Sequence, residues 1–390
     1  MQRRRCTVTS QRRRGAVMVF TLVMIFVLLG FASLTLDVGA LYGVRGDLQN
    51  AADAAALSGA SMFASDAMAK VRENSSVSFG EVSSAIFDRA QAVALRDASF
   101  GASGTVLAQS EVATGWINLA SSTSAIDTGK PASQFNAVHV LARRSHASAN
   151  GPVQFFFASI FGKSDGEVSA SATAAYDDRV SGYDPGAGGA DLLPFTMNLT
   201  EYNNQVAAGS DTYDYDSGTD NVYSGKDGVP EVKMYPNNLA PGNFGLVNIG
   251  NSNYGTPNQV EDIENGVAPA DLVKEIGTEQ LTFYDGNGKA VTYSIRGDPG
   301  LTASLESSIK TRIGDVVAIA VHDVVTGNGA NTKYRVVGIR FARVMGVKLQ
   351  GSSSGRGLWV QPVSYNGPGV IVNPNAPSSG GVAGRIVLVR

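Results

Sequence analysis

The chain offers few side chains for acid–base or nucleophilic chemistry. Its histidines are His139, His146 and His322, and Asp323 directly follows the last of them. A His/Asp pair could activate a serine nucleophile, but we identify no serine on a strand-to-helix elbow that would complete such a site. We therefore expect no catalytic residues, no bound cofactor and no enzymatic activity. His139 and His146 lie in and just after a predicted strand, and we expect them at a solvated strand edge.

Carboxylates are the one concentrated group of potential ligands. Asp211, Asp214, Asp216 and Asp220 lie within ten residues of one another. Hard oxygen ligands at this density could bind Ca²⁺, although their spacing does not match an EF-hand. Tyrosines alternate with these acids, which predicts a solvated hairpin. Asp214, Asp216 and Asp220 are calcium candidates within it, and no other metal site is expected because no His/Cys cluster has ligand spacing.

A phosphate-binding loop is not expected, although Gly162, Lys163 and Ser164 have the residue order that ends one. That motif requires a glycine five residues before Gly162, where this chain has Phe157. The pattern instead predicts a short apolar helix over 151–162, with Pro152 near its start and Gly162 past its end.

The element that must position the rest of the chain is a membrane helix near the N-terminus. An uncharged apolar run covers residues 16–36 and follows a cluster of six arginines, namely Arg3, Arg4, Arg5, Arg12, Arg13 and Arg14. About 20 residues cross the hydrocarbon core of a bilayer, and arginines keep their flank in the cytoplasm. We expect residues 1–15 in the cytoplasm, a single span in the inner membrane, and a periplasmic body that begins at Asp37. Arg12, Arg13, Arg14 and Asp37 would set this topology.

A cleaved secretory signal is the alternative reading of the same segment. Val38-Gly39-Ala40 offers small residues for cleavage just after the apolar run. The apolar part of a signal is usually about 7 to 15 residues long, which is shorter than this run. A twin-arginine signal fits less well, because no polar-then-apolar motif follows Arg13 and Arg14. We expect the segment to be retained as an anchor.

Charge and cysteine content exclude further classes of protein. The formal net charge is −3, but without the six N-terminal arginines 25 of the 31 basic residues remain against all 34 acidic residues. An acidic exported body has no electrostatic reason to bind nucleic acid. Cys6 is the single cysteine and lies on the arginine side of the span. No intrachain disulfide can form, so the body must depend on a hydrophobic core.

Small residues continue the helical pattern beyond the span. Apolar residues recur at three- and four-residue steps as far as Ala60, which predicts a stalk that prolongs the membrane helix. Gly39 and Gly43, and further on Ala51 and Ala55, are spaced by four residues. Small residues at this spacing allow two helices to approach closely. We expect these four residues to contact a partner helix, from another subunit or from a second copy of the chain.

The body is predicted to be α+β. A helix over 78–99 and strands over 114–119, 136–142 and 167–176 give region 37–180 helices packed on an antiparallel sheet. Residues 181–190 are Gly-rich and read as a linker. Region 191–390 is predicted to be a β-rich domain with one helix over 301–312 and strands over 281–284, 290–295, 316–321, 334–339, 357–362 and 386–389.

Two N-terminal segments together with Arg14-Gly15 resemble the TadE/TadG-like module of Flp (Tad) pilus assembly proteins. They read Leu36-Asp37-Val38-Gly39-Ala40-Leu41-Tyr42 and Leu48-Gln49-Asn50-Ala51-Ala52-Asp53-Ala54-Ala55-Ala56-Leu57. Later segments extend the likeness to TadG-like proteins, among them the phenylalanine-rich stretch 152–161 and the Ser/Ala/Thr strand 168–174. The resemblance implies a bitopic inner-membrane protein of a pilus or tight-adherence system, whose partners are the membrane and other pilus-assembly subunits.

One departure from the pilin-like members of such systems bears on the role. These members are cleaved after a glycine and carry a glutamate five residues later, whereas the fifth residue after Gly15 is Phe20. We therefore favour an assembly or anchoring protein over a fibre subunit. The alternative is an envelope or secreted ligand-binding protein or adhesin that uses the C-terminal domain, with calcium as a candidate ligand.

Overall fold

The computed structural model describes residues 14–73, 77–96, 104–120, 125–235, 245–250, 255–298, 303–351 and 355–389. The chain forms two compact units, each assembled from segments that are distant in sequence. The smaller unit comprises Met1–Ala54, Gln91–Glu111 and Leu141–Ser171, and the larger unit comprises Ala55–Ala90, Val112–Val140 and Ala172–Arg390. These units do not follow the predicted boundaries at 37–180 and 191–390, since residues 172–390 lie together in one unit.

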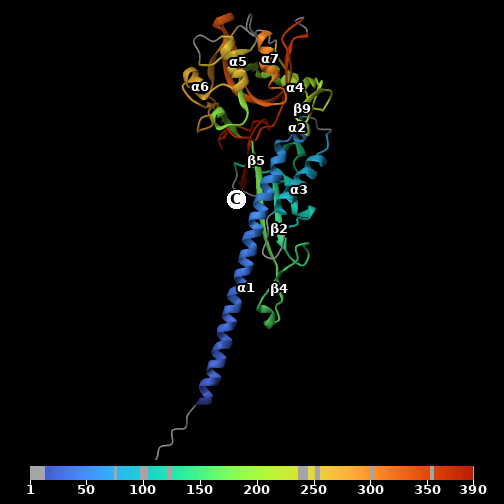
Figure 1. Ribbon diagram of the computed structural model, residues 1–390, viewed down its shortest axis with the longest axis vertical. Helices are drawn as coiled ribbons and strands as arrows, with labels where there is room; N and C mark the ends of the chain where they lie inside the picture. Colours follow the sequence, from blue (N-terminus) through green and yellow to red (C-terminus); the bar gives the residue numbers. More distant parts are fainter. Residues whose placement is uncertain are drawn as a thin grey trace, which may run out of the picture. The chain divides into compact units, whose positions relative to one another are not determined.

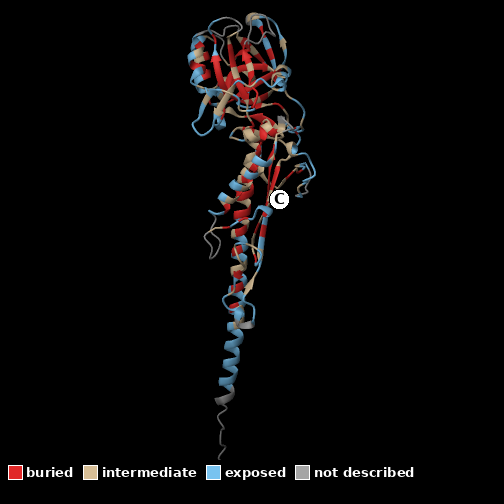
Figure 2. Ribbon diagram, turned by 90° about the vertical axis from the view of Figure 1, so that its right-hand side faces the viewer, coloured by how far each residue is buried: buried red, intermediate tan, exposed pale blue. Residues whose placement is uncertain are grey.

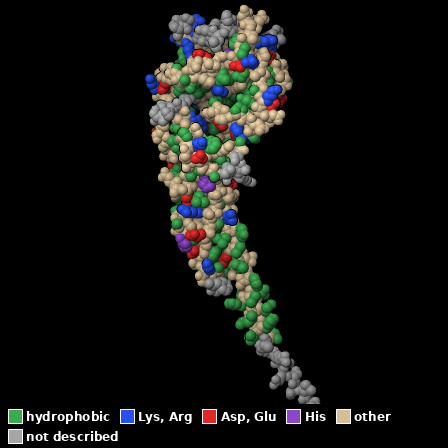
Figure 3. Space-filling model, turned by 180° about the vertical axis from the view of Figure 1, so that it is seen from behind, with side chains coloured by type: hydrophobic (Ala, Val, Ile, Leu, Met, Phe, Trp, Pro, Cys, Tyr) green, Lys and Arg blue, Asp and Glu red, His purple; other side chains and the backbone are tan. Residues whose placement is uncertain are grey.

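The N-terminal helix α1 (Arg14–Ala60) is 47 residues long and forms the predicted span and stalk as one element (Figure 1). It contains no proline, so its backbone ladder is uninterrupted. The large apolar side chains between Val17 and Leu36 are exposed by 45% to 76%. They appear as the hydrophobic side chains that surround the lower part of α1 in Figure 3. An apolar surface of this length is typical of a helix that lies in lipid.

Burial on α1 begins at Ser33, which is 6% exposed, and from Asp37 onward it follows the helical period. Within the smaller unit Asp37, Val44, Leu48, Ala51 and Ala52 are each no more than 3% exposed. The steps of three, four and seven residues place them on one face, which Figure 2 shows as the buried part of the helix. The helix is therefore amphipathic beyond Asp37, whereas it is apolar all round before that residue.

The rest of the smaller unit is short elements. They are η2 (Gln109–Glu111), β3 (Val153–Gln154), η4 (Ala158–Phe161) and β4 (Asp165–Gly166), together with parts of α3 (Gly80–Ala94), β2 (Ala137–Arg144) and β5 (Val168–Asp177). The helix predicted over 151–162 is wrong in its first half. Residues 153–154 pair with β4 as an antiparallel strand, and only Ala158–Phe161 is helical, as a 3₁₀ turn that ends at Gly162 in the left-handed conformation.

In the larger unit a four-stranded sheet has the order β1-β2-β5-β18, with β1 at Val112–Gly115 and β18 at Arg385–Val389. The C-terminal strand thus returns to pair with β5, where Val387 faces Ala175. α3 buries Val82, Ile86 and Ala90 on one face, as its period predicts. The predicted end of this helix at Ser99 lies outside the described residues. Two further helical segments, η1 (Ser61–Ala64) and α2 (Asp66–Glu73), follow α1.

A seven-stranded sheet forms the centre of the larger unit, in the order β10-β16-β15-β13-β11-β7-β14. Strand β14 also pairs with β15, so five of these strands close into a ring, and closure removes free strand edges. Only the β14–β7 pair is parallel among the pairings of known register. The strands are β7 (Asp191–Asn198), β10 (Val232–Tyr235), β11 (Leu246–Asn248), β13 (Tyr293–Asp298), β14 (Val316–Thr326), β15 (Lys333–Lys348) and β16 (Gly357–Pro362).

Two apolar clusters pack against this sheet. One is built around Phe195, Ile319 and Val344, and the other around Leu192, Ile295 and Phe341. The helices of this region are α4 (Leu199–Ala208), α5 (Thr256–Asn265), α6 (Pro269–Ile276) and α7 (Glu306–Lys310). Small sheets are formed by β8 (Tyr213–Asp216) with β9 (Asn221–Ser224), and by β6 (Val180–Tyr183) with β12 (Leu281–Thr282) and β17 (Val370–Val372).

The mixed α+β class is confirmed, and the β-rich character of the second half is as predicted. The linker predicted over 181–190 is not one throughout, because Ser181–Tyr183 belong to strand β6, which pairs with both β12 and β17. Its glycine is required by packing rather than by flexibility, since a Cβ on Gly182 would lie 2.4 Å from the carbonyl oxygen of Leu281.

Candidate functional site

The best-defined polar site in the smaller unit is the carboxylate of Asp37. This residue follows the apolar run directly and is 3% exposed. Its Oδ1 accepts a hydrogen bond from the backbone N–H of Phe156 at 2.8 Å, and its Oδ2 accepts one from Ala158 at 2.6 Å. The N–H of Phe157 is shared between both oxygens, at 3.4 Å and 3.1 Å. Three successive amides therefore converge on one carboxylate.

The loop between β3 and β4 presents these amides because it turns sharply on both sides. Gly162 closes the 3₁₀ turn with φ of 82°, a conformation that glycine adopts without strain. Gly166 in β4 lies under the ring of Phe155, since a Cβ there would be 2.6 Å from Cζ of that ring and 3.5 Å from Cδ2 of Leu41. The backbone of the β3–β4 loop is consequently held close to α1.

Burial and hydrogen bonding act in opposite directions on Asp37. Burial by itself raises the pKa of the Asp37 carboxyl, because it disfavours the charged form. The amides of Phe156, Ala158 and Phe157 together outweigh that effect, so the pKa lies below its usual value. The carboxylate is ionised at neutral pH and its oxygens are occupied by backbone donors. Its chemistry is that of a clamp that holds the β3–β4 loop on the helix, rather than that of an acid or base.

A second buried carboxylate supports the same unit. Glu111 is 4% exposed, and its Oε1 accepts a hydrogen bond from Nε of Arg143. Its Oε2 accepts a bond from the N–H of Ala108 at 2.7 Å. Asn150 bridges the segment at Val106 and the carbonyl of Arg143. Sequence reasoning missed this pair, and the spacing of 32 residues between its members gives no local signal.

The residues predicted to set topology are only partly described. Arg12 and Arg13 lie outside the described residues, and Arg14 is the first residue of α1. Asp37 occupies the predicted position directly after the span, and it has in addition the role of loop clamp. What sequence reasoning missed is its partner, the backbone of 156–158. The aromatic stretch after Pro152 is the available signal, but its composition favours a helix.

The four small residues predicted to contact a partner helix lie in different surroundings. A Cβ added to Gly39 or Gly43 would meet no atom within 4 Å, so this part of α1 is open. Ala51 and Ala55 are 1% and 0% exposed, so their side chains are already covered by this chain. Any partner helix that docks on small residues would therefore use the part of α1 around Gly39 and Gly43.

The three histidines occupy separate places. His322 is fully buried, with Nδ1 2.9 Å from Oγ1 of Thr196. Burial lowers its pKa to about 4, and the neighbouring Asp323 pairs with Arg335 instead. The ring of His139 is 2.9 Å from Oγ1 of Thr173 and the ring of His146 is 3.0 Å from Oδ1 of Asp165. The predicted solvated edge holds for His146, which is exposed, whereas His139 is half-buried.

Two Gly-x-Ser-x-Gly spacings do occur in the chain, at Gly162–Gly166 and Gly351–Gly355. The first connects η4 to β4, so it is not a strand-to-helix elbow, and the serine of the second lies outside the described residues. At the first, Ser164 donates to Oδ2 of Asp165 at 2.9 Å and the ring of His146 contacts Oδ1 of the same carboxylate. The carboxylate stands between hydroxyl and imidazole, which is the wrong order for a nucleophile and its base.

The acidic run forms the predicted hairpin, β8 with β9, in which Asp214 faces Tyr223. Asp216 accepts bonds from the N–H of Gly218 and the hydroxyl of Thr219, and Asp220 accepts one from Tyr215. In the described part of the chain no group of three or more His, Cys, Asp or Glu residues is placed to hold a metal ion. Asp214, Asp216 and Asp220 are thus not gathered into such a group.

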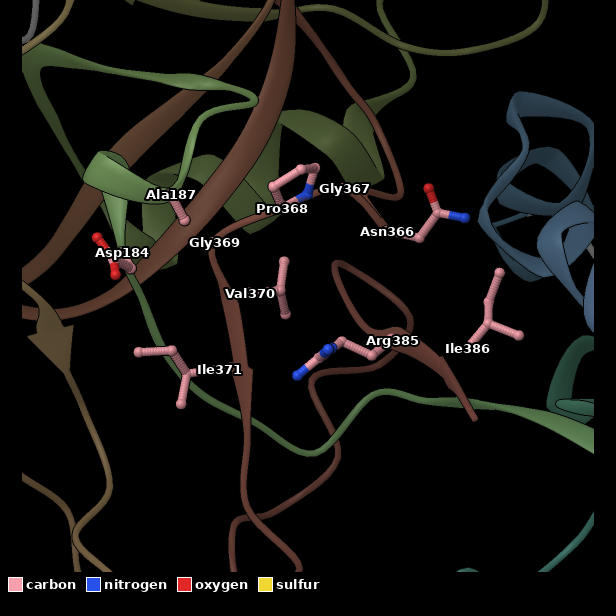
Figure 4. A pocket seen from close by; sticks show the side chains of 10 residues that line it. All are labelled: Asp184, Ala187, Asn366, Gly367, Pro368, Gly369, Val370, Ile371, Arg385 and Ile386. Carbon is pink, nitrogen blue, oxygen red and sulfur yellow. The ribbon is translucent and has the colours of Figure 1, made fainter. Parts of the chain in front are cut away.

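A cavity of about 570 Å³ lies in the larger unit beside β6 and β17 (Figure 4). Asp184 and Arg385 are the charged residues among its lining, and the remainder is Asn, Gly, Pro and aliphatic side chains. Oδ1 of Asp184 accepts from the N–H of Gly186 and Oδ2 from the amide of Gln280. None of the lining residues is a serine, histidine, cysteine or glutamate, so this cavity offers no nucleophile with a base.

Comparison with known proteins identifies the N-terminal segment. Residues 15–62 match the family model described as putative Flp pilus-assembly TadE/G-like. No curated protein and no solved structure matches the chain significantly. The matched range takes in almost all of α1, including its apolar part, Asp37 and the open glycines at 39 and 43. The chain therefore carries a TadE/G-like Flp pilus-assembly (Tad) domain at residues 15–62.

Proposed function

We propose that this protein is a single-pass inner-membrane component that supports the assembly or anchoring of a Flp/Tad-type pilus. It acts by binding other pilus-assembly subunits, without a catalytic step. The observation that carries this proposal is α1 itself. It matches the pilus-assembly family, its first part has the exposed apolar surface of a lipid-embedded helix, and its second part is built into a folded body.

The orientation follows from charge on the two flanks of the span. Six arginines precede the apolar run, and Asp37 follows it. Positive residues are retained on the cytoplasmic side, so the body lies in the periplasm. Disulfides could form in the periplasm, but Cys6 is the single cysteine of the chain, so the body folds without one.

Retention of the anchor is supported by the contacts of Asp37. Cleavage after Val38-Gly39-Ala40 would remove the carboxylate that binds the amides of 156–158. Three N–H groups would then lose a charged acceptor, and hydrogen bonds to a charged group contribute more than neutral ones. A signal that is discarded has no reason to form such contacts with the mature body.

Partner binding is assigned to the open part of α1 just beyond the span. A Cβ added to Gly39, Gly43 or Gly46 would have no atom within 4 Å, and small residues allow close approach of a second helix. The partners are other single-pass subunits of the pilus machinery, with a second copy of this chain as a further candidate. Such an arrangement would join the anchor to the rest of the assembly at the membrane surface.

The test is to delete the gene and count surface fibres by negative-stain electron microscopy, then to restore the intact gene or an Asp37→Asn variant. Loss of fibres, recovered with the intact gene, is the expected result. Surface adherence measured on the same strains gives a second readout. Normal fibres in the deletion strain would contradict the proposal and favour an envelope ligand-binding protein or adhesin.

A further inference from the structure

The β3–β4 loop, residues 155–163, exposes aromatic side chains next to the membrane helix. Phe156 is 61% exposed and Phe157 is 40% exposed. Both belong to the same compact unit as the apolar part of α1. Adjacent exposed phenylalanines form a contiguous apolar patch, and a patch of this kind marks a contact with something outside the fold.

The loop overlaps the apolar run along the axis of α1. A hollow of about 420 Å³ lies between them and is lined by Ala158 and Lys163 from the loop, and by Val27, Gly30, Phe31, Ser33 and Leu34 from the helix. Leu34 and Val27 are about 4.5 and 15 Å below Asp37 along the axis, at about 1.5 Å per residue. The hollow beside the loop therefore extends past Asp37 to the level of the second half of the predicted span.

Six backbone N–H groups of the loop have acceptors within the smaller unit. The N–H groups of Phe156, Phe157 and Ala158 bind Asp37. The N–H of Phe155 donates to the carbonyl of Ser164, that of Gly162 to Ser159, and that of Lys163 to Ala158. Satisfied backbone groups are what a membrane requires of any segment that enters it, since lipid offers no hydrogen bonds.

The one lysine of the loop fits the same environment. Lys163 is exposed and lines the hollow beside α1. A lysine near the interface extends its charged end to the phosphate groups of the lipids while its aliphatic stem stays in the apolar layer. Aromatic rings with a nearby cation are typical of protein segments that lie at the level of the headgroups.

We propose that this loop is a second membrane contact, and that Phe156 and Phe157 insert into the phospholipid leaflet on the side of α1 away from the N-terminal arginines. Asp37 holds the loop at that depth. The proposal rests on the proposed anchoring by α1. We assign this contact to the phospholipid leaflet, because the loop is continuous with the lipid-facing part of the helix and lies below the point where that helix leaves the membrane.

The chain is well suited to a direct test because Cys6 is its single cysteine. In a full-length Cys6→Ser background, single cysteines are introduced as Phe156→Cys and Ser159→Cys in the loop. Phe31→Cys reports the span and Asn50→Cys reports the water-exposed stalk. All four positions are exposed in the fold, so the substitutions remove no core contact. Each variant is spin-labelled and reconstituted in phosphatidylethanolamine/phosphatidylglycerol vesicles at about one protein per vesicle.

Power-saturation electron paramagnetic resonance then compares relaxation by oxygen, which concentrates in lipid, with relaxation by a water-soluble nickel chelate. We expect the labels at 156 and 159 to respond more strongly to oxygen, like the label at 31, and the label at 50 to respond to nickel. Nickel-dominated labels at 156 and 159 with an oxygen-dominated label at 31 would overturn the loop contact and leave the anchor intact. A nickel-dominated label at 31 would overturn both. Dipolar broadening at 156 would overturn the lipid assignment by placing a second copy there.

Discussion

Glycines at two places on α1 have opposite roles, and leucine substitutions can separate them. A Cβ on Gly59 would lie 3.3 Å from Cγ2 of Ile86 and 3.4 Å from Cγ1 of Val138. The rest of a leucine side chain has no room there, and overpacking of this kind costs about 1–3 kcal/mol. At Gly43 nothing lies within 4 Å, and replacing a glycine inside a helix gains up to about 1 kcal/mol.

Both glycines lie in α1, so the helix gain is common to the two variants, and their unfolding free energies should differ by the overpacking cost alone, about 1 to 3 kcal/mol. Urea unfolding of the full-length protein in detergent can be followed through Trp116 and Trp359, which both lie in the larger unit with Gly59. We expect a lower midpoint for Gly59→Leu, and an unchanged or higher midpoint for Gly43→Leu.

Leucine substitutions on the open face also test partner binding, when the variants are expressed in cells and cross-linked before purification. The Gly39→Leu/Gly43→Leu double variant should insert in the membrane normally but recover fewer pilus-assembly subunits, since its leucines fill the open face. Equal destabilisation by Gly43→Leu and Gly59→Leu would refute the distinction between open and packed glycines. Full recovery of partners with the double variant would refute the assignment of the contact to this face.

Three other predictions follow from the polar groups. Asp37→Asn should accelerate hydrogen exchange at the amides of 156–158, measured by mass spectrometry against an Asp47→Asn control. In the parent protein the pKa of Asp37 is lowered, so the protection of these amides from exchange should stay constant between pH 8 and 5. It should be lost only as the pH falls below the ordinary pKa of 3.8. The pKa of buried His322 is lowered from 6.5 to about 4, so the unfolded chain takes up a proton at a higher pH than the folded chain does. The free energy of unfolding should therefore fall by about 3 kcal/mol between pH 6.5 and 4. A His322→Phe variant whose unfolding free energy, measured in urea, fell just as steeply with pH would contradict the assignment to His322. Millimolar calcium should leave the unfolding temperature unchanged, because Asp216 and Asp220 already accept hydrogen bonds within their hairpin, whereas a rise that Asp214→Asn/Asp216→Asn abolished would support the adhesin alternative.

Elements with a strong local period were predictable from the sequence. The apolar run, the stalk to Ala60 and the buried face of α3 each repeat at helical spacing over several turns. Strand β5 and the hairpin of β8 with β9 were also identified, because alternation and turn residues are local signals. These elements account for the α+β class and for the position of Asp37 at the end of the span.

Features that depend on distant contacts were not predictable in this way. Residues 156–158 have the composition of an apolar helix, but their amides bind a carboxylate about 120 residues earlier in the chain. That tertiary contact outweighs local helix propensity. Glu111 and Arg143 meet for the same reason. Ser181–Tyr183 resembles a linker because of its glycine, yet packing against Leu281 makes it a strand.

The pairing of β18 with β5 has a consequence for how the protein is made. Strand β5 is synthesised about two hundred residues before its outer neighbour, which is formed by Arg385–Val389 at the end of the chain. At roughly 5–20 residues per second, the outer edge of β5 stays open for roughly 10–40 s during synthesis and export. An open edge is a template for aggregation, so the nascent protein needs protection during that interval. A chain truncated before residue 385 would retain this open edge, so Arg385–Val389 both complete the four-stranded sheet and cover the edge of β5.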